Sequence, residues 1–323
     1  MNRRPRPYHG ARTRAPAAVL ATLAAAALAL AGCGSGGGTG SGPATSAPAT
    51  AAFPATAGGV TLAHRPTRIV SLAPTATEML YAVGAGTQVV AVDDQSTYPS
   101  QAPRTDLSGF KPNAEAVAAK NPDLVVISND LDTIKAQLTQ LKIPVLLLPA
   151  ASTLDDMYQE LTTVGTLTGH TAEASAENGR IRADIAKLVA GVATRTRPLT
   201  YYYELDPNLY TVTSKTFVGS VFALLGLTNI ADPADAGGKA GGYPQLSAEA
   251  VVKANPDLVF LADVKCCQQS LATVSARAGW AAVAAVRDHR VFTLDDDIAS
   301  RWGPRVVDLL RAITDALATV PTS

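Results

Sequence analysis

The chain has 323 residues, of which 47% are hydrophobic and 17% charged, and its 27 basic side chains balance 27 acidic ones. That balance depends on the first 32 residues, which hold no acid and five arginines: Arg3, Arg4, Arg6, Arg12 and Arg14. Without them, 22 basic side chains face 27 acidic ones. A mildly acidic protein is not expected to bind nucleic acid, because phosphate binding requires an excess of lysine and arginine.

The amino-terminal segment has the pattern of an export signal. Its arginines precede an apolar run over residues 17–31, which is too short to span a bilayer comfortably and is followed at once by Gly-Ser sequence. We therefore predict a signal peptide over residues 1–32. Leu30-Ala31-Gly32-Cys33 resembles a bacterial lipobox, which implies cleavage before Cys33 and lipidation of its thiol. The alternative is an ordinary secretory signal with an incidental cysteine.

A tether and a first lobe follow. Residues 33–59 predict a flexible stalk, because Gly, Ser, Thr, Ala and Pro offer almost nothing to bury. The folded part is expected to begin at Val60 and to form an N-terminal lobe over residues 60–170. Its elements, predicted from apolar periodicity and turn residues, are a strand at 68–72, a turn at 74–75, a helix at 77–83 ending at Gly84, strands at 89–92 and 143–148, and a helix at 154–167.

One segment of the chain occurs twice. Residues 114–126 (Ala-Glu-Ala-Val-Ala-Ala-Lys-Asn-Pro-Asp-Leu-Val-Val) return at 248–260 with nine of thirteen positions identical. Each copy predicts a short helix, stopped by Asn-Pro because proline disfavours helix, and then a buried strand. Two distant copies indicate a duplicated half-domain rather than a solenoid. The sequence therefore predicts an α/β fold of two similar lobes, each a mostly parallel sheet flanked by helices, with a ligand cleft between them.

The second lobe, over residues 198–323, repeats this order less regularly. Around the second repeat copy we predict a strand at 198–205, a helix at 217–225, strands at 229–231 and 290–294, and a helix at 304–317. The joining segment, residues 171–197, carries apolar residues at helical spacing: Ile181, Ile185, Leu188, Val189 and Val192. We expect this single helix to let the lobes rock only slightly, because paired loop hinges are absent.

Residues with reactive or metal-binding chemistry are few. The sequence shows no nucleophile motif and no phosphate-binding loop, so an enzyme is not expected. His64, His170 and His289 are scattered, which argues against a metal site, and no resident cofactor is predicted. Residues 237–242, rich in glycine, predict a mobile loop at the edge of the cleft. Cys266-Cys267 is a disulfide between neighbours, a pair of free thiols or, as the least favoured alternative, a metal or redox site.

Several segments together resemble one family. These are residues 68–78 (Arg-Ile-Val-Ser-Leu-Ala-Pro-Thr-Ala-Thr-Glu), the Tyr98-Pro99 region, both repeat copies and the single inter-lobe helix. They are similar to the class III solute-binding proteins of bacterial ABC importers, which take up corrinoids, ferric siderophores and haem. The resemblance implies a monomer that delivers a bulky chelate to a permease dimer with its ATPase. It also implies that Glu115 and Glu249, matched in the two repeats, dock on that permease.

The candidate ligand-binding residues follow the strand ends of both lobes, where ligands bind in α/β sheets. They are Thr75, Asp94, Gln95, Tyr98, Phe110 and Asn129 in the first lobe, and Tyr203, Tyr243, Asp297, Arg301 and Trp302 in the second. Aromatic faces could stack on a macrocycle, and Arg301 could bind an anionic group or polar side arm. Segments 93–99, 243–247 and 301–305 resemble the cobalamin binders, although Tyr243 stands where those proteins have tryptophan.

The sequence thus predicts a lipid-anchored solute-binding protein on the extracytoplasmic face of the cell membrane. Its most favoured ligand is cobalamin or another corrinoid. The alternatives are a ferric-siderophore or haem carrier of an iron importer and, in a different class, a sensor domain that binds the same solute without transporting it.

Overall fold

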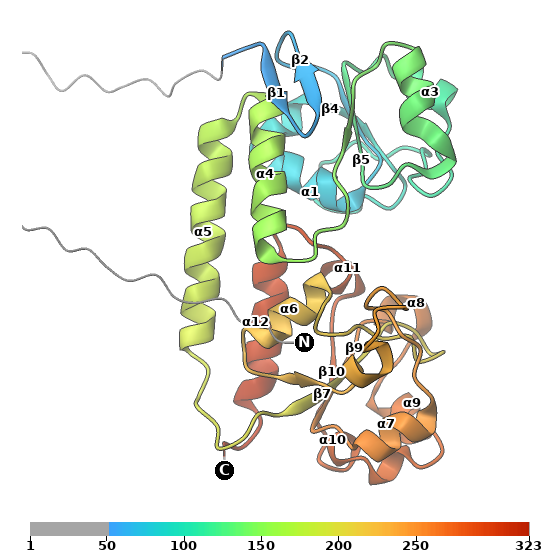
Figure 1. The fold of residues 1–323 in the computed structure, drawn as a ribbon, viewed down its shortest axis with the longest axis vertical. Helices are drawn as coiled ribbons and strands as arrows, with labels where there is room; N and C mark the ends of the chain where they lie inside the picture. Colours follow the sequence, from blue (N-terminus) through green and yellow to red (C-terminus); the bar gives the residue numbers. More distant parts are fainter. Residues whose placement is uncertain (1–51, 323) are drawn as a thin grey trace, which may run out of the picture. The chain divides into compact units, whose positions relative to one another are not determined.

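Each half of the folded chain is built on a four-stranded parallel sheet (Figure 1). The computed structural model describes residues 52–322, all of which belong to one compact unit of the chain. In the first lobe the strand order is β4-β3-β5-β6, and in the second it is β10-β9-β7-β8. The strands are β3 (Ile69–Ser71), β4 (Val89–Val92), β5 (Leu124–Ile127), β6 (Val145–Leu147), β7 (Thr200–Glu204), β8 (Thr228–Asn229), β9 (Leu258–Leu261) and β10 (Val291–Thr293).

Counted within its own lobe, each sheet has the same strand order, 2-1-3-4, with every pairing parallel. Parallel neighbours need a crossover connection, which places helices on the sheet faces. The central strands are accordingly apolar and buried throughout, as in β5 and β9. This arrangement confirms the predicted α/β class with two similar lobes.

The helices cover both sheets and join the lobes (Figure 1). They are α1 (Pro74–Ala82), α2 (Ala114–Ala118), α3 (Ile134–Gln140), α4 (Leu154–Thr168), α5 (Thr171–Ala190), α6 (Phe217–Ala223), α7 (Ala248–Ala254), α8 (Val264–Cys267), α9 (Leu271–Ser275), α10 (Ala284–Arg287), α11 (Asp296–Ala299) and α12 (Val306–Ala318). Four short 3-10 turns are η1 (Ala85–Gln88), η2 (Leu131–Thr133), η3 (Asp232–Asp235) and η4 (Trp280–Ala282). Among the described residues, no helix has the length and apolarity needed to cross a membrane.

The repeated segment plays the same structural part in both lobes. Its helix becomes α2 or α7, and its strand becomes β5 or β9. The Asn before each proline takes a left-handed conformation, with φ of 50° at Asn121 and 47° at Asn255. The following aspartate accepts hydrogen bonds from the start of the neighbouring strand, Asp123 from the Thr67 and Arg68 amides and Asp257 from the Thr200 amide. The duplication therefore extends to the bonds that set strand register.

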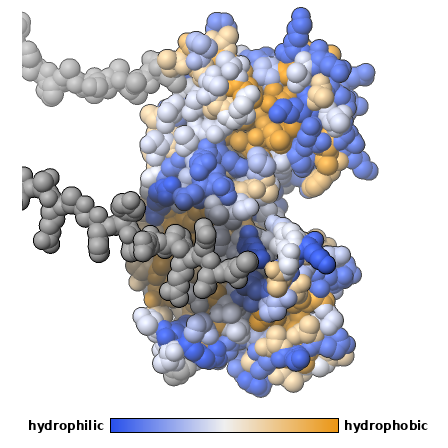
Figure 2. All heavy atoms as spheres, viewed as in Figure 1, coloured by the Kyte–Doolittle hydropathy of each residue, from blue (hydrophilic) through white to orange (hydrophobic). Residues whose placement is uncertain are grey.

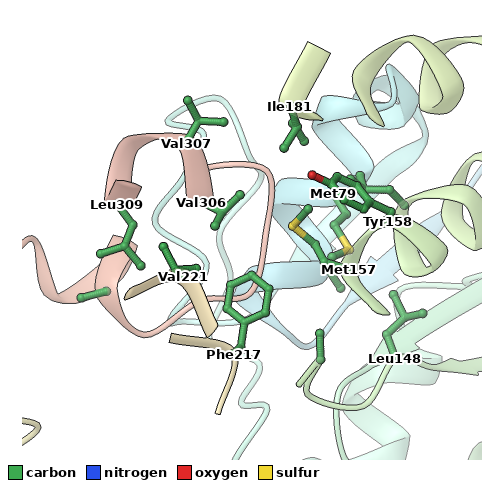
Figure 3. Close-up of a cluster of buried hydrophobic side chains, with 14 of the residues drawn as sticks. Met79, Leu148, Met157, Tyr158, Ile181, Phe217, Val221, Val306, Val307 and Leu309 are labelled. Atoms are coloured by element: carbon green, nitrogen blue, oxygen red, sulfur yellow. The ribbon is translucent and has the colours of Figure 1, made fainter. Parts of the chain in front are cut away.

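The two lobes share one hydrophobic core (Figure 3). The cluster takes Met79 from α1 and Met157 from α4 of the first lobe, Ile181 from α5, and Val221 from α6 and Val306 from α12 of the second. Each sheet has a second, smaller core on its other face, which belongs to that lobe alone. Because the shared core is continuous, the lobes are held together by packing as well as by the connector α5.

Three predictions about local structure were wrong. Residues 55–57, assigned to the stalk, form strand β1 (Ala55–Ala57), which pairs with β2 (Val60–Leu62) around Gly58-Gly59. Both glycines have positive φ, which suits a tight hairpin turn, so ordered structure begins before Val60. The expected turn at Pro74 is the first turn of α1, where proline fits because its missing donor is not needed. The prediction also lacked α3, the crossover between β5 and β6.

The joining segment is helical over α5, so the last residues of the expected 171–197 connector, from Gly191 on, lie beyond the helix. The predicted signal peptide, Cys33 and the greater part of the stalk lie outside the described residues. On the face drawn in Figure 2, hydrophilic residues surround smaller hydrophobic areas, and the surface is hollowed between the lobes on the side away from α5.

Candidate ligand-binding site between the lobes

The carboxyl ends of the two sheets meet at the lobe junction. In parallel sheets, ligands bind beyond these ends where the strand order reverses, which here is between β3 and β5 and between β7 and β9. The loop after β4 touches the segment after β10: Thr97 Oγ1 donates to Asp297 Oδ2 at 3.4 Å, and Arg301 Nη2 donates to the Gln95 carbonyl at 3.1 Å. The ligand-binding edges of both lobes therefore face the same space.

A buried ion cluster fixes this junction. Glu78, from α1, has a side chain only 1% exposed, and its carboxylate accepts hydrogen bonds from Arg301 Nη1 at 2.7 Å and Arg305 Nε at 3.0 Å. Burial by itself lowers the pKa of Arg305, but the hydrogen bond and charge of Glu78 outweigh burial and raise it. We name Glu78, Arg301 and Arg305 the inter-lobe latch, because the acid comes from one lobe and both bases from the other.

The latch changes the role expected for Arg301. Its side chain is 9% exposed, and its guanidinium is committed to Glu78, the Gln95 carbonyl and Asp297. Charge-assisted bonds to a buried carboxylate are strong, so this group is not free to bind an anionic ligand. Arg301 was predicted in the cleft because Arg301 and Arg305 follow the last strand. No role was predicted for Glu78, the partner of both. An acid inside the apolar helix Thr77-Glu78-Met79-Leu80 is the signal that calls for such a partner.

Acidic residues and one lysine continue from the latch along the second lobe. Asp297 accepts from Arg301 Nη2 at 3.0 Å and from Lys265 Nζ at 3.1 Å. Lys265 also pairs with Asp295 at 2.7 Å, and that hydrogen bond is the main cause of the raised pKa of Lys265. Asp297 was predicted at the site, whereas Lys265 was missed. Nothing in the sequence around Lys265 indicates that it lies beside the distant turn that carries Asp295 and Asp297.

Two aromatic rings are exposed at the ligand-binding edges. Phe110 is 71% exposed and follows Gly109, where a Cβ would lie 2.3 Å from the Leu72 carbonyl at the end of β3. Only glycine permits that approach, and it brings the Phe110 loop to the edge of the sheet. Tyr243 is 49% exposed and follows the glycine-rich loop, which folds round the Asp235 carboxylate through the amides of Ala240 and Gly242. Burial raises the pKa of Tyr243.

Two other aromatic residues predicted at the site, Tyr203 and Tyr98, contact protein groups. Tyr203 is fully buried and donates to the Ala299 carbonyl at 2.9 Å, so its predicted place in the cleft was wrong. The reason is that β7 is covered on both faces, with Tyr203 in the shared core and Tyr202 in the smaller one. Tyr98 is 47% exposed, but one face of its ring lies 4.3 Å from the Arg305 guanidinium, in a pocket of about 370 Å³ lined also by α5 and α12.

Trp302 packs against the shared core beside Glu160 of α4. No role was predicted for Glu160 from the sequence. Burial raises the pKa of Glu160 to about 8, although the Trp302 indole N–H acts in the opposite direction. Thr75 is buried in the first turn of α1, close to Gly303. Asp94, Gln95 and Asn129 are exposed in loops that follow strands, and their role in ligand binding stays a prediction.

The remaining predicted residues lie away from the junction or form a covalent pair. Glu115 and Glu249 are exposed and occupy matching first turns of α2 and α7. The sulfur atoms of Cys266 and Cys267 are joined in a disulfide. Within residues 52–322, no group of three or more His, Cys, Asp or Glu side chains comes together in a way that could hold a metal ion.

Two similar α/β lobes with facing ligand-binding edges and a helical connector define a two-lobed solute-binding protein. The chain belongs to the periplasmic binding protein family, whose model matches residues 69–298. It is 30% identical over 269 residues to the uncharacterized ABC transporter substrate-binding lipoprotein YvrC of Bacillus subtilis, covering 80% of this chain and 82% of that one.

Two solved structures are similar over nearly their whole length. The periplasmic vitamin B12-binding protein BtuF of Vibrio cholerae is 27% identical with a TM-score of 0.65, and the match covers 78% of this chain and 97% of that one. The periplasmic heme-binding protein HutB of Vibrio cholerae is 23% identical with a TM-score of 0.68, and the match covers 77% and 97%. The chain is therefore an extracytoplasmic solute-binding protein that works with an ABC permease, and its predicted family is confirmed.

Proposed function

We propose that this protein captures cobalamin or another corrinoid and delivers it to an ABC permease dimer driven by its ATPase. It does so as a monomer anchored through lipid on Cys33, and it catalyses no reaction. The observation that carries the proposal is the pair of exposed rings, Phe110 and Tyr243, one from each lobe at the facing ligand-binding edges. A corrin ring is broad and flat, and aromatic side chains gain both buried area and stacking against such a surface.

The charges at the junction agree with a ligand of low net charge. Glu78, Asp295 and Asp297 carry three negative charges, which balance the three positive charges of Arg301, Arg305 and Lys265 in the same network of ion pairs. An anionic ferric siderophore would need uncommitted cations, as in other anion-binding sites. The B12-binding relative with the same fold supports the same choice.

Haem is the second candidate, because the exposed phenol of Tyr243 could serve as an axial ligand to iron. Burial raises the pKa of Tyr243, however, and a phenol binds iron as its phenolate. The raised pKa adds to the cost of forming that phenolate. His170 is not at the ligand-binding edges, since it lies at the start of α5 beside Arg65.

Delivery requires a docking surface, for which we propose Glu115 and Glu249. Both are exposed acids in the first turn of equivalent helices, where the amide donors of the helix start favour a negative charge. The like positions suit a permease of two like subunits. Reversing both charges, Glu115→Arg with Glu249→Arg, should leave ligand affinity unchanged and slow uptake, because exposed charges guide association more than they hold a ligand. Normal uptake by this variant would exclude the docking surface.

The ligand is tested by titrating the protein, expressed without residues 1–33, with cyanocobalamin, cobinamide, haemin and a ferric siderophore. The readout is tryptophan fluorescence, since Trp302 lies at the boundary between the lobes and Trp280 is buried in the second lobe. Saturation by the corrinoids alone is the expected result, and saturation by haemin or the siderophore alone would refute the proposed ligand. Cellular uptake of the same compound separates a transporter from a sensor.

A further inference from the structure

The Cys266–Cys267 disulfide lies at the ligand-binding edge of the second lobe, yet the proposed capture of a solute gives it no role. It ends α8, which directly follows the carboxyl end of β9 at the point where the strand order reverses. Cys266 is exposed and Cys267 half-buried, so a dissolved thiol can approach the bond. An exposed disulfide is more readily exchanged than one enclosed in a core.

The helix that carries this disulfide depends on a few local bonds. Four residues do not form a stable helix by themselves. At the start of α8, the Asp296 carboxylate accepts hydrogen bonds from the amides of Val264 at 3.0 Å, Lys265 at 2.9 Å and Cys266 at 3.1 Å. At its end, the ring closed by Cys266 and Cys267 limits the rotation of the backbone and of both side chains.

Lys265 connects α8 to the lobe junction. Its ammonium group lies between Asp295 and Asp297, and Asp297 in turn accepts from Arg301 of the inter-lobe latch and from Thr97 of the first lobe. A change in α8 therefore alters the charges and contacts of the surface at which the ligand-binding edges meet. Bonds and contacts form an unbroken chain from the disulfide to the other lobe.

We propose that Cys266–Cys267 is a redox-exchange site for an extracytoplasmic dithiol, and that its reduction loosens α8 and weakens ligand capture. The second effect rests on the proposed solute-binding function. One thiolate of the reductant attacks the exposed Cys266 sulfur, the sulfur–sulfur bond breaks, and Cys267 leaves as a thiolate that takes up a proton. The second thiol of the reductant then releases Cys266, so two electrons and two protons pass to the protein and the reductant becomes a disulfide.

The effect of reduction should be local. A disulfide stabilises a whole fold because it closes a loop and so restricts the unfolded chain. Cys266 and Cys267 are neighbours in sequence, so the loop that their disulfide closes is too short to have much of this effect. The melting temperature should therefore stay the same on reduction. The affinity for cyanocobalamin should fall by about tenfold, the change expected when about one residue must be ordered again on binding.

The test uses the mature chain with Cys33→Ser, oxidised or treated with dithiothreitol, and a matched variant that also carries Cys266→Ser and Cys267→Ser. Hydrogen exchange of residues 263–270, melting temperature and cyanocobalamin affinity are measured on each. In the Cys33→Ser protein, dithiothreitol should speed hydrogen exchange of residues 263–270 and weaken cyanocobalamin binding, and reoxidation should reverse both changes. The variant with Cys266→Ser and Cys267→Ser should have the exchange and affinity of the reduced protein, and dithiothreitol should change neither. Lys265→Ala should weaken binding in the same way, whereas Lys253→Ala, an exposed lysine on α7, should not.

The outcomes separate this inference from the proposed ligand. Unchanged exchange and affinity on reduction would overturn it, and so would a fall in melting temperature large enough to account for the weaker binding. Failure of the oxidised protein to bind cyanocobalamin would refute the corrinoid proposal instead. In that case the exchange rate of residues 263–270, measured without ligand, still decides whether reduction loosens α8.

Discussion

Replacing Glu78 by glutamine should destabilise the protein by about 3–5 kcal/mol, the range found when one partner of a buried ion pair is removed. The Glu78 side chain is 1% exposed, and the side chains of its partners Arg301 and Arg305 are 9% and 16% exposed. Glutamine keeps the size of the side chain but removes the acid paired with Arg305 and leaves Arg301 with Asp297 alone. The loss comes from buried charge without compensation, because the cavity is unchanged.

Urea unfolding of both proteins measures the difference. Asp155→Asn is the matched control, since the Asp155–Arg182 pair has the same chemistry but is 75% and 56% exposed. An exposed pair contributes about 0–1 kcal/mol. Adding Arg301→Met and Arg305→Met to Glu78→Gln should recover a large part of the stability, because no unpaired charge then remains buried. A loss below about 1 kcal/mol for Glu78→Gln would refute the argument, since it would place the latch among the weak surface pairs.

Three further predictions concern ligand, pH and motion. Phe110→Ala and Tyr243→Ala should each weaken cyanocobalamin binding by about 1 kcal/mol beyond the lost area, as calorimetry can show, and unchanged affinity in both would move the site elsewhere. The folded-state pKa of Glu160, about 8, lies above the ordinary glutamate value of 4.5 that the unfolded chain has. The folded protein therefore holds a proton that the unfolded chain loses, so stability falls as pH rises through that window, and Glu160→Gln should reduce this fall in urea titrations at several pH values. Solution scattering should change little when ligand binds, because the lobes share one core, and a large compaction would contradict this.

The sequence predicted the lobes because their signal is periodic and repeated. The two copies at 114–126 and 248–260 gave both helix–strand units, and the 89–92 strand has the predicted bounds. The short hairpin at Ala55–Leu62 was missed because its Ala, Thr and Gly residues have the composition of a linker. It is stabilised by packing on α4, a contact that no local pattern reports.

The site was harder to predict because the relevant contacts join distant positions. Glu78 and Arg301 are separated by 223 residues, and only the assembled lobes show that they neutralise each other. Tyr203 and Tyr243 are both tyrosines near strand ends, yet one is buried in the core and the other is exposed. Composition and spacing identify residues that can stack or bind charge, whereas burial decides which of them are available.

The shared core also limits how far each lobe can be treated as a module. If the chain were cut within α5, the faces of α4, α6 and α12 that now pack together would be exposed to water. Neither half would then fold as a soluble protein by itself, although each has its own complete sheet. A chimera that takes its second lobe from a relative would have to bring matching α6 and α12 surfaces, so altered ligand preference is more readily engineered in the loops that carry Phe110 and Tyr243.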